Sequence, residues 1–152
     1  MSTTPESNTA ALPEAPGFLI LYHGLVDLSL ENPHGRLSET YLAEIAPEYE
    51  VAVRATPLPS ANCHRVDTLV RLSARAGIQV VFVAELTYRA EVQLHRVAAE
   101  DVQRVLRVDV AQALFPLVKE VFETNGRFAG YPGVHLDGLD FAKAFAADPE
   151  PG

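Results

Sequence analysis

The sequence predicts an α+β domain, in which a four-stranded antiparallel sheet has helices packed on one side. Two observations lead to this fold class. Residues 18–94 are dominated by alternating apolar and polar positions, the pattern of β-strands. Residues 97–145 instead carry apolar side chains at helical spacing. Strands first and helices last is the order of domains whose sheet and helices form separate layers.

The first two strands are expected at residues 18–30 and 49–54. In the first, apolar Val26, Leu28 and Leu30 alternate with Asp27, Ser29 and Glu31, so that one face is polar. The second alternates throughout, and the connection between the two strands opens with an Asn-Pro pair that is typical of turns.

The third and fourth strands are expected to form a long antiparallel hairpin. Residues 65–75 place apolar side chains at most even positions and polar ones at most odd positions, and the outer face is markedly basic. Ala76-Gly77 then predicts a tight turn into a β-rich segment that runs from Ile78 to about Leu94.

Two helices are expected next. A short one covers residues 97–107, and the main amphipathic helix begins near Asp109, which is placed to cap it. Asn125-Gly126 predicts its end. Pro116 lies inside these limits and is expected to kink the helix. The apolar face consists of Ala111, Leu114, Phe115, Val118, Val121 and Phe122.

The length of 152 residues fits one domain, expected at residues 17–147, with disordered tails at 1–16 and 148–152. Twelve Lys and Arg against twenty Asp and Glu give a net charge of −8, which disfavours nucleic acid and anionic lipid as partners. Neither a membrane span nor a signal peptide is recognisable. The single cysteine, Cys63, fits a reducing cytoplasm.

Nothing in the sequence predicts an enzyme, a metal site or a cofactor. The five histidines lack ligand spacing, and no glycine-rich phosphate loop is present. Asp27 and Glu31 lie four residues apart on one strand, so they share a face, roughly 13 Å apart. They have no neighbouring His, Lys or metal ligand, which argues against an acid/base pair.

Five motifs, in order along the chain, resemble those of the bacterial export chaperone family SecB. They are Asp27-Leu28-Ser29-Leu30-Glu31-Asn32-Pro33, Pro47-Glu48-Tyr49, Phe82-Val83-Ala84-Glu85-Leu86, Leu114-Phe115-Pro116 and Leu136-Asp137-Gly138-Leu139-Asp140-Phe141. The resemblance runs from about Phe18 to Phe145.

The chain also departs from the family pattern at several positions. Ile45 replaces a tryptophan, Val110-Ala111 replaces Cys-Pro, and residues 89–92 replace a glycine-rich strand end. The loop around residues 130–133 is longer. These changes bear on partners and clients more than on the fold.

The resemblance implies an ATP-independent chaperone in the cytoplasm. It would form a homotetramer, a dimer of dimers, bind unfolded precursor proteins and deliver them to the SecA motor of the translocase. By the same resemblance, Asp27, Glu31, Val83 and Glu85 would form the SecA-binding face. An apolar client groove would be lined by Ile45, Tyr49, Val51, Val53, Phe141 and Phe145.

Other interpretations stay open at this point. Each apolar residue assigned to the groove could be ordinary core, and the carboxylates could belong to a solvated sheet face. A SecB-like chaperone dedicated to one client, such as an antitoxin, is one alternative function. A small-molecule-binding α+β domain is another.

Overall fold

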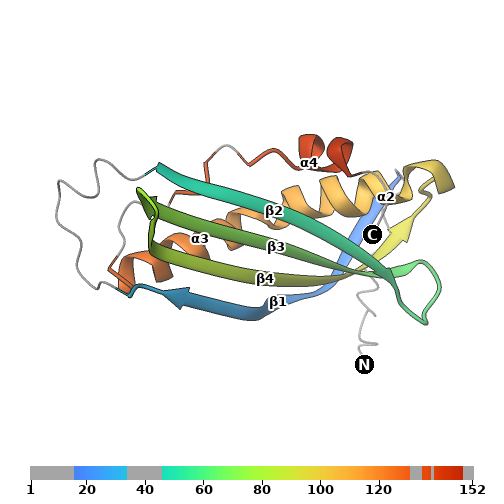
Figure 1. The fold of residues 1–152 in the computed structure, drawn as a ribbon. Helices are drawn as coiled ribbons and strands as arrows, with labels where there is room; N and C mark the ends of the chain where they lie inside the picture. Colours follow the sequence, from blue (N-terminus) through green and yellow to red (C-terminus); the bar gives the residue numbers. More distant parts are fainter. Residues whose placement is uncertain (1–15, 34–45, 131–134, 138, 149–152) are drawn as a thin grey trace, which may run out of the picture.

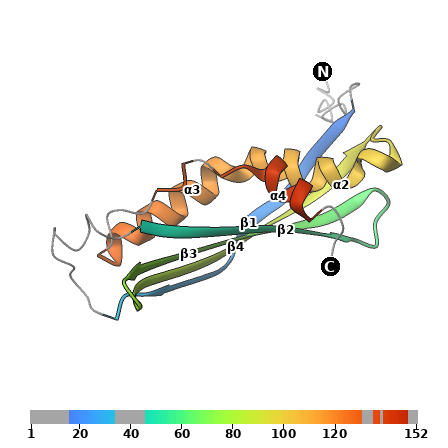
Figure 2. The same cartoon turned by 45° about the horizontal axis from the view of Figure 1, so that its top comes forward.

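The computed structural model describes residues 16–33, 46–130, 135–137 and 139–148. Strands β1 (Gly17–Glu31), β2 (Ala46–Pro57), β3 (Cys63–Ala76) and β4 (Gln79–His95) form one sheet. A helical layer lies against a single face of this sheet (Figures 1 and 2). The predicted fold class is therefore confirmed. Apart from Pro16 and Asp148, the predicted tails lie outside the described residues.

The strand order is β1-β4-β3-β2, and each neighbouring pair is antiparallel. Among the described strands, β1 and β2 are therefore the two edges. β3 and β4 form the predicted hairpin, which turns at Gly77 and Ile78. Gly77 has φ +63°, a conformation that glycine adopts without steric cost and that tight hairpin turns require.

An irregularity close to this turn sets the hairpin register. Ala76 pairs with Gln79 and Arg75 with Val80, but Ala74 pairs with Phe82, so Val81 is an additional residue on β4. A bulge of this kind moves all following residues by one position. As a result, the even-numbered side chains of both strands share the buried face, and Arg71 lies opposite Glu85.

Two further irregularities interrupt the pairing of β1 with β4, at Leu21 and at Val26. Leu28 and Leu30 face the core as the alternation predicts, but Val26 is 46% exposed because it falls at an irregularity. The prediction that Val26 shares their face is therefore wrong.

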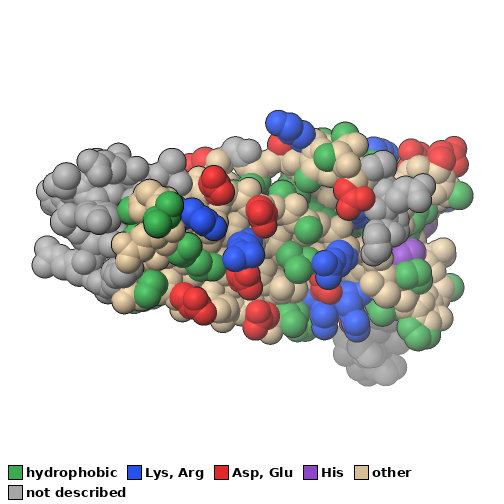
Figure 3. Space-filling model, viewed as in Figure 1, with side chains coloured by type: hydrophobic (Ala, Val, Ile, Leu, Met, Phe, Trp, Pro, Cys, Tyr) green, Lys and Arg blue, Asp and Glu red, His purple; other side chains and the backbone are tan. Residues whose placement is uncertain are grey.

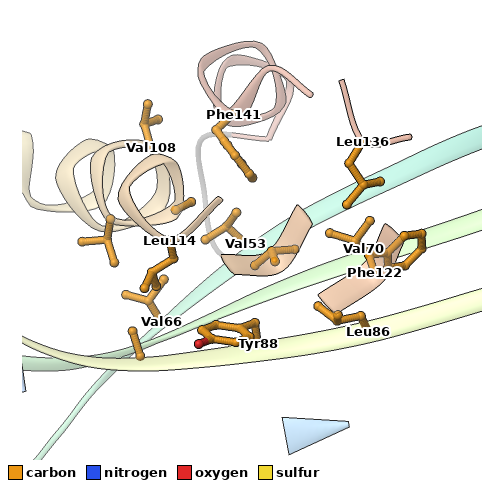
Figure 4. Packing of buried hydrophobic residues seen from close by; sticks show 14 of the residues in the cluster. Val53, Val66, Val70, Leu86, Tyr88, Val108, Leu114, Phe122, Leu136 and Phe141 are labelled. Carbon is orange, nitrogen blue, oxygen red and sulfur yellow. The ribbon is translucent and has the colours of Figure 1, made fainter. Parts of the chain in front are cut away.

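The core lies between the sheet and the helices (Figure 4). Val66, Val70, Leu86 and Tyr88 of the sheet point toward Leu114 and Phe122 of the helical layer, while Leu136 and Phe141 close it from above. Phe82 and Phe122 are fully buried, as are most of the even-numbered side chains of β3 and β4.

The two helices predicted at residues 97–107 and from Asp109 are joined into one continuous helical segment, and the last helix, which the family resemblance implied, is present. The joined segment runs without a break through η1 (Ala99–Asp101), α2 (Val102–Arg104), the π-helix η2 (Val105–Val110) and α3 (Ala111–Phe128), and α4 (Phe141–Ala147) follows. The predicted cap at Asp109 is wrong, because the buried Leu106 and Val108 keep the chain helical through this point. Asp109 instead pairs with Arg104, at 3.3 Å.

The predicted end of the main helix at Asn125-Gly126 is also wrong. Gly126 is buried within α3, and the left-handed glycine is Gly130, with φ +87°. Pro116 lies inside α3, as predicted. None of the described helices combines the length and apolar character of a membrane span.

Candidate functional site

A groove of about 430 Å³ lies between the edge strand β2 and the helix α4. The β2 side is formed by residues 51–56, and the α4 side by Phe141, Ala144 and Phe145, with Asp148 at the helix end. Arg107 of η2 completes the lining. The groove therefore combines apolar side chains, the backbone of an edge strand and one buried cation.

The segment that precedes α4 fixes this helix above β2. The amide of His135 donates to the Tyr49 hydroxyl at 3.3 Å, and the amide of Leu136 donates to the Glu123 carboxylate at 3.2 Å. Leu136 is itself fully buried. A further tie is the hydrogen-bonded ion pair of Lys119 with Asp137. The chain is thus held to both β2 and α3 before α4 starts.

The start of α4 is capped by Asp140, whose carboxylate accepts a hydrogen bond from the Lys143 amide at 3.0 Å. A capping side chain of this kind satisfies one of the amides that the first helical turn leaves unpaired.

Ionisation near the groove reflects these ties. Burial raises the pKa of Tyr49 above its usual value, and the hydrogen bond from His135 opposes part of that rise. The hydrogen bond from Lys119 holds the pKa of Asp137 below its usual range. At neutral pH, Tyr49 is therefore uncharged and Asp137 is ionised.

Four of the six predicted groove residues line this groove: Val51, Val53, Phe141 and Phe145. Val53 and Phe141 are also buried parts of the core, whereas Val51 and Phe145 are half-buried. Tyr49 lies outside the lining and anchors the segment before α4. Ile45 falls outside the described residues.

The four residues predicted for a docking face lie together on the sheet face opposite the helices. Asp27 of β1 pairs with Thr87 of β4, and Glu31 pairs with Val83 two steps along the same face. Glu85 lies between these pairs, opposite Ser29. We call Asp27, Glu31, Val83 and Glu85 the sheet patch.

A shallow depression of about 420 Å³ overlaps the sheet patch, because Asp27 and Glu85 line it. Ala52, Leu69 and Thr87 also line it, together with the charged Glu50 and Arg71. The Nε atom of Arg71 lies 3.3 Å from the Glu85 carboxylate, and both side chains are about half exposed. One acidic member of the patch is therefore already paired with a cation.

Further cross-strand ion pairs lie on this face. Figure 3 shows acidic and basic side chains interleaved across it. Arg89 pairs with Asp67 through two hydrogen bonds, of 2.8 and 3.2 Å, and Arg65 lies 3.8 Å from Glu91. The basic outer face predicted for β3 is thus largely matched by acidic partners.

Sequence reasoning missed two features of these surfaces. It did not identify Arg107, which is only 6% exposed although it is charged. An arginine among apolar residues of a helical segment was the available signal. It also missed the pairing of Arg71 with Glu85, which depends on the Val81 irregularity.

Comparison with known proteins gives consistent results. Residues 13–150 match the family model described as preprotein translocase subunit SecB. A protein-export protein SecB of Zymomonas mobilis is 30% identical over 136 residues, which cover 89% of this chain and 82% of that protein. The protein-export protein SecB of Magnetococcus marinus is 30% identical over 141 residues, which cover 92% of this chain and 89% of that protein.

The fold is shared with a solved structure as well. The Mycobacterium tuberculosis SecB-like chaperone Rv1957, in complex with a ChAD peptide from the HigA1 antitoxin, matches with a TM-score of 0.67. The sequences are 16% identical, and the match covers 82% of this chain and 91% of that one. Fold, family model and curated relatives agree, and the chain belongs to the SecB family of protein-export chaperones.

Proposed function

We propose that this chain is an ATP-independent, non-enzymatic holdase of the cytoplasm, which binds unfolded precursor proteins and delivers them to SecA. The observation that carries the proposal is the groove beside the edge of β2, lined by Val51, Val53, Phe141 and Phe145. The export function named for the curated relatives supports it.

The groove suits an extended polypeptide for two reasons. β2 pairs with β3 alone among the described strands, so its other edge can accept main-chain hydrogen bonds from an added strand. Side chains of that strand would alternate, and those that face α4 would meet Phe145 and Ala144. Main-chain bonds of this kind tolerate many sequences, which a chaperone of diverse precursors requires.

Binding of a denatured precursor in the absence of ATP tests this proposal. Phe145→Ala should weaken the affinity roughly 3- to 10-fold, because it removes aromatic surface from the groove. Ile78→Ala is the control, since Ile78 is an exposed apolar residue at the β3–β4 turn. Equal losses in both variants would contradict the assignment of the groove.

We assign delivery to the sheet patch, Asp27, Glu31, Val83 and Glu85, as the docking surface for a basic segment of SecA. Exposed carboxylates would speed the encounter and orient the partner, while Val83 would add apolar contact. Asp27 and Glu31 lie on an open sheet face, an environment suited to docking.

The proposed assembly is a homotetramer, a dimer of dimers, that uses the β1 edge and the exposed side of α3. β1 exposes an apolar band formed by Leu19, Leu21, Tyr22, Leu25 and Val26. α3 exposes Leu117 and Phe128. An open apolar edge strand readily pairs with a strand of another chain. We therefore expect a second subunit to bury this surface.

Light scattering on the purified protein should therefore give about four times the chain mass of 16.5 kDa. Leu21→Lys with Val26→Lys should reduce the assembly, because charge on the β1 edge opposes pairing. A wild-type protein that remains monomeric at micromolar concentration would refute the tetramer.

The second candidate is a SecB-like chaperone dedicated to one client, and its motivating observation is that the SecB-like chaperone Rv1957, which shares the fold, is bound to a peptide from an antitoxin. The curated relatives named for protein export favour the general chaperone. Capture from cells separates the two: a general chaperone retains many unfolded precursors, whereas a dedicated one retains a single client.

A further inference from the structure

We propose that Arg107 is a carboxylate-recognition residue of the groove, which selects extended client segments that place an aspartate or glutamate side chain beside it. The inference rests on the proposed client binding and deepens it by naming the chemistry of the preferred client. Arg107 lies in the groove lining and is the charged residue that the described part of the chain buries most completely.

The contacts of Arg107 leave its donors only partly used. Its Nε atom donates to the Val53 carbonyl at 3.0 Å, which joins η2 to β2. Its guanidinium carbon lies 5.1 Å from the centre of the Phe145 ring, within the range of a cation–π contact. Its Nη1 atom is buried and has no hydrogen-bond acceptor among the described residues.

The carboxylate nearest to Arg107 is only loosely held. Asp148 Oδ2 lies 4.0 Å from Arg107 Nη2, beyond the usual length of a charge-assisted hydrogen bond. The Asp148 side chain is 72% exposed and follows the last turn of α4. Asp148 is therefore a weak intramolecular partner of Arg107, and a better-placed carboxylate from a client can displace it.

The chemistry of the side chain identifies the missing partner. A guanidinium stays charged at all physiological pH values, and a buried charge is unfavourable unless it is paired and hydrogen-bonded. A carboxylate can accept two parallel hydrogen bonds from the same guanidinium. A client strand along β2 would bring its side chains to Arg107, because Val53 and Phe145, which contact Arg107, also line the groove.

The local helix geometry is consistent with a specialised role. Arg107 lies in η2, a six-residue π-helix. π-Helical turns are rare and frequently occur at functional sites, because the wider turn redirects side chains. Here the turn directs the arginine of an otherwise buried apolar segment toward β2 and α4.

The net charge of the protein makes the prediction diagnostic. A chain with net charge −8 repels acidic peptides at long range, so a general electrostatic effect would favour the neutral peptide over its acidic analogue. A preference for the acidic peptide requires a local cation. Arg54 is the other cation in the lining, and it is exposed.

The test compares two extended apolar peptides, acetylated and amidated at their ends, that differ by one central aspartate or asparagine. Calorimetric titration of the wild-type protein should give roughly 5- to 10-fold tighter binding of the aspartate peptide. A third peptide, with asparagine and an unblocked C-terminus, separates side-chain from terminal carboxylates. It should bind no better than the blocked asparagine peptide.

Two variants assign the preference to this site. Arg107→Met should reverse it, so that the asparagine peptide binds more tightly, and circular dichroism checks that the fold is retained. Asp148→Asn, at an exposed position, should improve binding of the aspartate peptide about 2-fold, because it removes the competitor. Arg54→Met is the matched control and should keep the preference.

The outcomes are distinct. Equal binding of the two blocked peptides to the wild-type protein would overturn the role of Arg107 but leave the groove function intact. Two other outcomes would also overturn the role of Arg107. One is that only the peptide with the free C-terminal carboxylate binds more tightly than the blocked asparagine peptide. The other is that the Arg107→Met variant is folded and still prefers the aspartate peptide. Failure of every peptide to bind would instead contradict the groove function itself, and this inference with it.

Discussion

Phe122→Ala should lower the free energy of unfolding by about 3–5 kcal/mol, a large part of the stability of a single domain. Phe122 is fully buried on α3 and packs within the core that joins the helical layer to the sheet (Figure 4). Its loss removes the transfer free energy of an aromatic ring and leaves a cavity that rigid neighbours fill only partly.

Ile78→Ala is the control, because it also truncates a large apolar side chain to alanine but lies at the β3–β4 turn, outside the core and the proposed assembly surfaces. Ile78 is 99% exposed, so this replacement should change the unfolding free energy by less than about 1 kcal/mol. Urea denaturation of both variants measures the difference. Similar losses in the two would contradict the described burial of α3 against the sheet.

Reversal of two charges in the sheet patch should weaken the affinity for SecA by at least roughly 10-fold at low salt. Asp27→Lys with Glu31→Lys turns attraction for a basic partner into repulsion over one continuous surface. The control, Glu100→Lys with Asp101→Lys, changes the net charge equally on η1, outside the sheet patch. It should have a much smaller effect.

Salt provides a second check on the sheet patch. Binding to the wild-type protein should weaken as ionic strength rises, because exposed charges are screened, and the patch variant should respond less. The patch variant should still bind denatured clients, since the groove lies at β2 and α4. Equal SecA affinity of the wild type and the patch variant would remove this assignment.

The ion pair of Arg71 with Glu85 refines the test. Arg71→Gln should strengthen SecA binding modestly, because it leaves the Glu85 carboxylate available to the partner. Glu85→Gln should weaken it, because the same face then loses an acid and keeps the cation.

The strands were predictable from sequence because each has one buried face. Strict alternation on β3 placed Val66, Val70 and Leu72 inward, and the structure confirms this. The irregularities at Leu21, Val26 and Val81 leave no local signal, because an additional residue in a strand looks like any other. Pairing partners across strands, such as Arg71 with Glu85, therefore required the structure.

Helix limits failed for a related reason. Asp109 and Asn125-Gly126 are valid local signals, but buried contacts on both sides of each extend the helix past them. The predicted sheet patch and most predicted groove residues came from family resemblance, and the structure brings them together. Arg107 matches none of the family motifs, so only its burial and its contacts reveal it.

The central claim is that the groove beside β2 holds extended polypeptide without an energy source. The most direct measurement is the refolding of a chemically denatured precursor after dilution, with and without this protein and with no ATP present. The account predicts that the protein delays refolding in proportion to its concentration, and that Phe145→Ala delays it less. Refolding at the same rate with and without the wild-type protein would contradict the account.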